Sequence, residues 1–354
     1  MISFYNSQID SYNAIKGSKL KVDNFVNNDP TKINWSRALK NDLSRLVKHK
    51  FDKIFIIRGM YRPYYKRWVY FNKQFNEMIY QLLKLFPNQK LENLVICVTG
   101  IGARKNFSAL MTDTIPNFDF HEKSQCFSLY AYSKQSDLGE LYKTVEHSDF
   151  VRNENVPDEI LSSFQTIYDD ITISKEDIFY YVYGILHSPE YKERFQADLK
   201  KMLPRIPYAQ GFWAFTQAGR NLAYWHINYE TVEPYPVAEY TEELSLQDYQ
   251  VGKMRFGKHN EQEDKTTIVY NSKIKLMEIP LEAYDYVVNG KPAIEWVIES
   301  YKNTNDNNSG IINNPNDCSD NPRYIIDLVK RVVRVSVETM KIVNNLPPLN
   351  ERNT

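Results

Sequence analysis

Short apolar runs in the first half of the chain predict β-strands. FDKIFIIR (51–58) and RWVYFN (67–72) flank the turn-prone segment Tyr61-Arg62-Pro63-Tyr64. The continuous apolar core of residues 94–98 predicts a buried strand. The alternation in QCFSLYAYS (125–133) predicts a strand in a sheet with two different faces.

Apolar residues at helical spacing predict helices in both halves. Ser174 is suited to be an N-cap because Asp177 follows three residues later, and Pro189 fits the first position of a helix. The predicted helices cover residues 34–47, 71–86, 157–169, 174–187, 188–201, 210–225 and 322–344, with two more on either side of Gly290-Lys291-Pro292.

The second half also carries strand signals. Residues 251–256 predict one strand, and residues 266–270 and 273–279 predict a hairpin that turns at Asn271-Ser272. An Asn-rich loop covers residues 303–317. Helices and strands therefore occur together along the chain without the regular alternation of a parallel α/β protein.

The predicted fold class is α+β with two lobes. Residues 1–34 are polar and are interpreted as a lead-in segment with at most a short strand. Residues 35–170 form a mixed first lobe with mixed or antiparallel sheet elements, and residues 171–354 form a helix-rich second lobe with β-hairpins and a long C-terminal helix. The acidic, loop-rich stretch 134–174 marks the boundary between the lobes.

Composition narrows the class of protein. Hydrophobic residues make up 42% and aromatic residues 14%, which is typical of a globular chain. No apolar run reaches the roughly 20 residues that span a bilayer, and the first residues lack a secretory pattern, so a cytoplasmic protein with no membrane contact is expected. Cys97, Cys126 and Cys318 lie far apart and the six histidines are scattered, so neither a disulfide framework nor a metal site is predicted.

The net charge does not by itself suggest a nucleic-acid partner. Lys plus Arg (44) equals Asp plus Glu (44). Proteins that bind nucleic acid commonly carry a basic surface, because neutralising phosphates supplies much of their affinity. A neutral total still allows one basic face that is balanced by an acidic one.

Two segments resemble catalytic motifs weakly. One is the segment Thr99-Gly100-Ile101-Gly102-Ala103, which follows a buried strand, as a glycine loop that binds a nucleotide or S-adenosylmethionine would. The alternative is an ordinary strand-to-loop turn, which explains the same two glycines. Glu263-Asp264-Lys265 could belong to a metal nuclease, but a solvated hairpin tip is the simpler interpretation. The adenine-methyltransferase tetrapeptide and the P-loop are absent from the sequence, so no catalytic, cofactor-binding or metal-binding residue is predicted.

Many separate segments in one order carry a family resemblance. In the second half these are residues 176–191 (EDIFYYVYGILHSPEY), 203–207 (LPRIP), 212–222 followed by HINYE (226–230), 251–256 (VGKMRF), 289–296 (NGKPAIEW), 309–317 (SGIINNPND) and 322–328 followed by LPPL (346–349). Thinner matches in the first half are residues 35–37, 61–63, 107–108, 112–113, 115–116 and 125–127. Together, across residues 35–349, they resemble the C-terminal specificity domain of type ISP single-polypeptide restriction-modification enzymes.

The resemblance implies a role in reading DNA. In that family one polypeptide joins a nuclease, a helicase-like translocase, an N6-adenine methyltransferase and this specificity region, which chooses the DNA sequence. The expected partners are therefore duplex DNA and those catalytic domains, in cis or in trans, with residues 35–170 on the methyltransferase side. S-adenosylmethionine, ATP and magnesium are expected only for the missing domains, and the chain alone is not expected to be an enzyme. Both an excised domain and a separate specificity subunit are compatible with the resemblance.

Three basic segments are candidate DNA contacts, because Lys and Arg bind phosphates and Arg also reads base edges. The densest interleaves four basic residues with tyrosines, and its alternative is an aromatic strand corner with solvated charges. The second lies on a loop after the buried strand. The third alternates along a predicted strand and its exit, so that its first two members share one face, or else forms a plain solvated edge. The candidates are, in that order, Arg58, Tyr61, Arg62, Tyr65, Lys66 and Arg67; Arg104 and Lys105; and Lys253, Arg255 and Lys258.

The leading hypothesis is a sequence-specific duplex-DNA recognition module. One alternative is an active methyltransferase or nuclease fragment with unrecognised motifs, which S-adenosylmethionine binding at Gly100 and Gly102 or magnesium-dependent cutting would reveal. Another is a scaffold that packs against the catalytic domains and contacts DNA without base preference.

Overall fold

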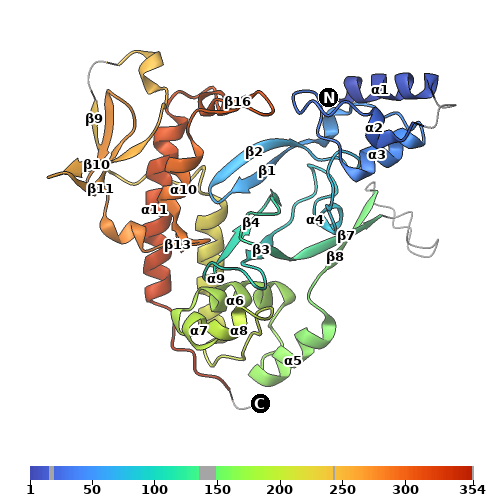
Figure 1. Ribbon diagram of the computed structural model, residues 1–354. Coiled ribbons are helices and arrows are strands. Elements are labelled where there is room, and N and C mark those ends of the chain that lie inside the picture. Colours follow the sequence, from blue (N-terminus) through green and yellow to red (C-terminus); the bar gives the residue numbers. More distant parts are fainter. Residues whose placement is uncertain (16–19, 135–148, 242–243, 353–354) are drawn as a thin grey trace.

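The computed structural model describes residues 1–15, 20–134, 149–241 and 244–352, and these form an α+β fold built from small sheets and eleven α-helices (Figure 1). The long helix α11 (Tyr324–Asn344) stands between a four-stranded sheet on one side and the strands of the first half on the other. The predicted α+β class and the long C-terminal helix are confirmed. None of the helices in the described ranges is long and apolar enough to cross a membrane.

The N-terminal segment is helical, so the prediction of a polar lead-in with a short strand is wrong. Tyr5 and Ile9 recur four residues apart and pack, fully buried, against Leu39 and Leu43. The Tyr5 hydroxyl also donates to the Val47 carbonyl at 3.1 Å. This helix carries a single narrow apolar stripe on an otherwise polar surface. Such a pattern is too weak to predict a helix from the sequence. The helices of this cluster are α1 (Ile2–Ala14), α2 (Val22–Phe25) and α3 (Arg37–Ser44).

The strands of the first half form three small sheets. As predicted, residues 51–72 form two strands around the Pro63-Tyr64 turn, and every residue of the strand at Val95–Val98 is buried. The sheets are β2 (Tyr65–Tyr70)–β1 (Ile56–Arg62)–β5 (Ile115–Pro116), β4 (Ala109–Thr112)–β3 (Val95–Val98)–β6 (Gln125–Ser128), and β7 (Tyr130–Lys134)–β8 (Phe150–Glu154), with the one-turn helix η1 (Lys53–Phe55) before β1.

Two predictions in this half are corrected. The predicted helix 71–86 survives only as α4 (Leu82–Leu85), because Asn72 and Asn76 bond the local backbone into turns and Met78 and Tyr80 adopt left-handed conformations. The predicted strand 125–133 divides at Leu129, whose amide donates to Leu94 O, so that β6 and β7 join different sheets. Within the loop-rich stretch 134–174, the helix predicted at 157–169 is confirmed as α5 (Asp158–Tyr168), the strand β8 was not predicted, and residues 135–148 lie outside the described ranges.

The helices after residue 157 follow the sequence predictions closely. Ser174 and Asp177 form the predicted capping box, and Pro189 occupies the first turn of its helix. The predicted helix 188–201 is interrupted at Phe195. The helices are α5 (Asp158–Tyr168), α6 (Lys175–His187), α7 (Pro189–Arg194), α8 (Gln196–Leu199) and α9 (Phe212–Ile227).

A four-stranded antiparallel sheet follows in the order β10 (Arg255–His259), β11 (Gln262–Val269), β12 (Ile274–Met277) and β9 (Ala238–Thr241). The predicted hairpin at Asn271-Ser272 joins β11 to β12. The predicted strand 251–256 is wrong before Arg255. The Asn316 side chain binds the Val251 amide at 2.8 Å and the Val251 carbonyl at 3.0 Å, which replaces pairing with a strand.

Small elements complete the chain around α11. Only one full helix lies beside Gly290-Lys291-Pro292, because the element before it is a single 3-10 turn. The Asn-rich loop contains a short hairpin. These elements are η4 (Leu246–Tyr249), η5 (Leu281–Tyr284), β13 (Val287–Val288), β14 (Lys291–Pro292), α10 (Ala293–Ser300), β15 (Thr304–Asp306), β16 (Ile311–Asn313) and η6 (Pro315–Cys318).

The buried side chains gather in three clusters. The largest joins Met60 and Phe120 of the first half to Ile268 and Val332 of the second. A second surrounds α6 and α9 and also includes β3 and β4, and the third contains α1 and α3. Two clusters therefore draw on both sides of the boundary predicted at residue 170, and the division into two lobes stays a prediction.

Candidate nucleic-acid interface

Two cations of the densest predicted segment are paired with one largely buried carboxylate. The Arg58 guanidinium lies 3.0 Å from a carboxylate oxygen of Glu230, and Lys66 lies 3.2 Å from its other oxygen. The Lys66 side chain is only 9% exposed, and Tyr324 donates to Glu230 at 2.6 Å. Burial opposes ionisation of Glu230, but the charges of Lys66 and Arg58 hold its pKa below the usual range. These cations therefore compensate an internal carboxylate.

Of the other members of this segment, Tyr61, Arg62 and Arg67 are exposed or half-buried on the β1–β2 hairpin. Arg62 donates to the Asp119 carbonyl at 3.1 Å, and its guanidinium lies 4.9 Å from the Tyr61 ring centroid. Arg67 lies 5.7 Å from the ring centroids of Tyr61 and Tyr65, and it donates to the Asn313 side chain of β16. Tyr61 is 38% exposed and Tyr65 is buried. Arginines on aromatic faces form a cationic edge here.

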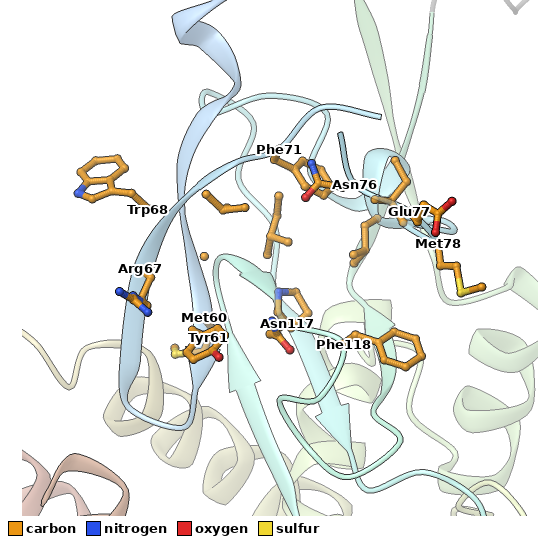
Figure 2. A pocket seen from close by; sticks show the side chains of 16 residues that line it. Met60, Tyr61, Arg67, Trp68, Phe71, Asn76, Glu77, Met78, Asn117 and Phe118 are labelled. Atoms are coloured by element: carbon orange, nitrogen blue, oxygen red, sulfur yellow. The ribbon is translucent and has the colours of Figure 1, made fainter. Parts of the chain in front are cut away.

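The same hairpin forms one wall of a largely apolar pocket of about 620 Å³. Figure 2 shows the pocket between the hairpin, with Met60 and Tyr61, and the segment that carries Glu77 and Met78, with Phe118 nearby. Its lining has few charged groups, so it fits an apolar or aromatic group better than a phosphate.

The loop of Arg104 and Lys105 becomes part of a larger basic cluster. Lys105 and Lys291 lie 5.5 Å and 4.8 Å from the Trp296 ring centroid. Burial lowers the pKa of Lys105 against the opposing effect of Glu122, and the neighbouring charges of Lys291, Arg62 and Arg104 lower it further. Arg104 extends into solvent with 94% of its side chain exposed. Sequence reasoning missed Lys291, because nothing in the linear pattern relates it to a loop about 190 residues earlier.

The third candidate segment lies on a polar groove of about 820 Å³. The groove is bounded by η4, the strands β10 and β11 with the turn 271–273, and the β15–β16 hairpin with its flanking residues. Amide, basic and hydroxyl side chains dominate its lining, which is Gln247, Asp248, Gln250, Val251, Gly252, Lys253, Arg255, Val269, Asn271, Ser272, Lys273, Asn303, Ile312, Asn314 and Asn316.

Some of the polar groups in this groove have structural roles. Asn271 donates to the carbonyls of Asp248 and Gln250 and accepts from two backbone amides of the next turn. Asn316 binds both backbone groups of Val251, and Lys273 lies 3.0 Å from Asp248. These side chains shape the groove and have little capacity left for a ligand.

Other groups in the groove are available. Within the described residues, the exposed side chains of Gln247, Gln250, Lys253, Arg255 and Asn303 have no hydrogen-bond or ion-pair partner. Lys253 precedes β10, so the predicted placement of Lys253 and Arg255 on one strand face is wrong, although both line the groove. Lys258 lies outside the lining, 72% exposed and 3.5 Å from Glu261.

Sequence reasoning found the basic members of this set and missed its amides. Gln247, Gln250 and Asn303 carry no charge and belong to loops, where such residues are common. Only the approach of η4 and the β15–β16 hairpin to β10 distinguishes them.

The two weak catalytic resemblances have local structural explanations. A Cβ atom on Gly100 would lie 1.7 Å from the Lys123 carbonyl, so this glycine permits a close backbone approach, and its amide donates to Glu122 O. On β11, Asp264 accepts from Thr266, and Lys265 lies 2.9 Å from Glu295. No group of three or more His, Cys, Asp or Glu that could hold a metal occurs among the described residues.

An α+β fold with a polar and basic groove is typical of a ligand-binding domain. Comparison with known proteins identifies its family. Residues 1–328 match the family described as the Type ISP C-terminal specificity domain. This range includes residues 1–34, which the sequence reasoning had left out of the resemblance. The match covers most of the chain, and the chain therefore belongs to this family. No curated protein matches it.

Three similar solved structures agree with this assignment. A nuclease-deletion mutant of the Type ISP restriction-modification enzyme LlaGI, in complex with a DNA substrate mimic, is 33% identical with a TM-score of 0.85 over 100% of this chain. The ATP-dependent Type ISP enzyme LlaBIII bound to DNA is 33% identical with a TM-score of 0.84, and the DrdV–DNA complex is 32% identical with a TM-score of 0.80, each over 98%. The matched regions make up 31%, 22% and 33% of those chains, so this chain spans a third or less of each.

Proposed function

We propose that this chain reads the sequence of duplex DNA for a restriction-modification enzyme. The observation that carries the proposal is the groove in which Gln250, Lys253 and Arg255 present side chains without partners among the described residues. Arg and Lys pair with guanine edges in the major groove, and Gln pairs with adenine. The DNA-bound state of the three similar structures supports the same role.

In this proposal the chemistry belongs to other parts of the enzyme. An N6-adenine methyltransferase and a translocase with a nuclease, in cis or in trans, would use S-adenosylmethionine, ATP and magnesium. This chain would supply the choice of site and no turnover of its own. Its DNA contacts divide into base readers in the groove and phosphate contacts on the basic loops.

The test is selection from a randomised duplex pool, followed by fluorescence-anisotropy titration of the retained DNA at low and moderate salt. An enriched motif whose affinity falls steeply with salt is the expected result. Binding without enrichment, in the presence as well as the absence of a cognate methyltransferase, would favour the scaffold alternative. Absence of binding at low salt would overturn the proposal for the isolated chain.

A further inference from the structure

The loop of Arg104 and Lys105 holds a carboxylate in an arrangement that suits an anion. The backbone amides of both residues donate to the same oxygen of Glu122, each at 3.0 Å, and the Arg104 Nε donates to the other oxygen at 3.2 Å. Successive backbone amides that converge on one oxygen form an anion-binding nest. Glu122 therefore occupies a site whose donors would also fit a phosphate oxygen.

The surroundings of this site carry more positive charge than one carboxylate balances. Lys291, Arg62 and Arg104 all lie near enough to act electrostatically on Lys105. Lys123 adds a further cation, and its ammonium group donates to the Gly102 carbonyl at 2.9 Å. Of these cations, Lys291 is also paired with Glu299. Such a cluster attracts polyanions.

The Glu122 carboxylate can leave the site without a rearrangement of the backbone. The backbone amide of Glu122 donates to the Asn289 side chain at 3.1 Å, and the backbone carbonyl of Glu122 accepts from the Gly100 amide at 3.0 Å. These bonds fix the main chain, whereas the carboxylate is held, among the described residues, only by the loop of Arg104 and Lys105. Rotation of the side chain would expose three donors.

We propose that this nest is a binding site for a backbone phosphate of DNA, and that Glu122 occupies it until DNA displaces the carboxylate. The inference rests on the proposed function, because it assigns one phosphate contact of the DNA-reading domain. It adds a restraint on binding: the carboxylate competes with every phosphate, whatever the sequence. Indiscriminate binding is therefore weakened, while a site that is also read in the groove supplies the energy for displacement.

The experiment compares Glu122→Ala with the wild-type chain on a random-sequence duplex. We expect Glu122→Ala to bind on the order of ten-fold more tightly at low salt, the gain typical of one charge-assisted hydrogen bond. The dependence of log K on log salt should steepen by about 0.9, the value for one added phosphate contact. Isothermal titration with inorganic phosphate should detect binding to Glu122→Ala and none to the wild-type chain.

Two further variants separate this site from a general charge effect. Glu193→Ala on α7 removes the same charge from an exposed residue with no side-chain partner in the described ranges, and it should leave the salt slope unchanged. Glu122→Gln keeps the shape of the side chain and guards against misfolding of the alanine variant, and it should also bind more tightly than the wild-type chain. Adding Arg104→Ala to Glu122→Ala should remove part of the gain, because it deletes the Nε donor and leaves both backbone amides in place.

The outcomes distinguish this inference from the proposed function. Unchanged or weaker random-duplex binding by folded Glu122→Ala and Glu122→Gln would overturn the inference, and it would mean that Glu122 only braces the loop. Enrichment of a motif by the wild-type chain would stand independently of that result. If the wild-type chain bound no DNA while Glu122→Ala bound inorganic phosphate, the proposed DNA role would be contradicted. The nest would then be a site for small anions only.

Discussion

At the scale of single residues, the partner of a side chain decides what it can do. Arg58 and Arg255 look alike in sequence, since both lie in basic segments beside aromatic residues. The structure pairs Arg58 with Glu230 and leaves Arg255 in the groove without an ion-pair partner among the described residues. This geometry favours Arg255 over Arg58 for DNA contact.

Arg255→Ala is expected to weaken binding to the selected DNA by about 1–3 kcal/mol and to relax the preference at one base pair. The reason is the loss of a bidentate donor for a guanine edge. Titration of the selected duplex and of its single-base variants measures both effects. Lys275→Ala is the control, because Lys275 is an exposed cation of the same sheet that does not line the groove. Equal losses of affinity in both variants would mean that Arg255 contributes only its positive charge and does not read a base.

Buried histidines should make the protein sensitive to acid. Burial lowers the pKa of His121 to about 3, with help from the charge of Lys105, and burial likewise lowers the pKa of His187 to about 3. The unfolded chain binds protons at these residues near pH 6.5 while the folded chain does not. Their contribution to stability is therefore complete above about pH 6.5 and is lost progressively as the pH falls toward 3.

His121→Leu is expected to flatten this dependence. Neither ring nitrogen of His121 has a partner within the described residues, so leucine removes the titrating group without breaking a hydrogen bond. Urea unfolding at several pH values between 7.5 and 5 measures the slope. The control is Phe120→Leu at the adjacent buried position, which should lower stability equally at every pH. An unchanged slope in His121→Leu would assign the acid sensitivity to other groups.

At the scale of elements, the predictions succeeded where local chemistry agreed with packing. The helix α6 begins at a capping box that the sequence predicts, and most residues of this helix are buried. The predicted helix 71–86 has apolar spacing but no comparable start signal, and Asn72 and Asn76 form turns instead. Periodicity alone did not distinguish the two segments.

The crossing of α6 and α9 depends on two glycines. A Cβ atom on Gly184 would lie 2.2 Å from the Phe215 carbonyl, and one on Gly219 would lie 1.9 Å from the Tyr180 carbonyl. Gly184→Ala must therefore push the helices apart, and it is expected to cost about 1–3 kcal/mol in the free energy of unfolding. Urea unfolding measures this cost. Gly252→Ala meets nothing within 4 Å and should change stability little, so a similar loss there would contradict the steric explanation.

At the scale of the whole molecule, Glu230 connects distant parts of the chain. It follows α9 and binds Arg58 and Lys66 of the β1–β2 hairpin and Tyr324 at the start of α11. The two cations belong to a segment that was predicted to contact DNA. In the structure they help to hold the β1–β2 hairpin, the end of α9 and the start of α11 together around one partly buried carboxylate.

Glu230→Ala is expected to destabilise the fold by roughly 2–3 kcal/mol, because it leaves Arg58 and the nearly buried Lys66 without their main counter-charge. Urea unfolding of the variant provides the measurement. The matched control is Glu233→Ala, three residues further on, which is exposed and has no side-chain partner in the described part of the chain. Destabilisation by Glu233→Ala of the same size would show that removing any local negative charge is enough.

The sequence by itself determined the fold class, the buried strand β3, the capped helix α6, the hairpin at Asn271-Ser272, the long last helix and the family. These follow from short-range periodicity, capping and turn chemistry, or from many ordered segments read together. Tertiary structure alone decided that residues 2–14 form a packed helix, that Lys66 is nearly buried, that Lys291 lies near Lys105, and that Gln250 shares a groove with Arg255. The physical reason is that a side chain's exposure and partners depend on segments far away in sequence, and no local pattern encodes their approach.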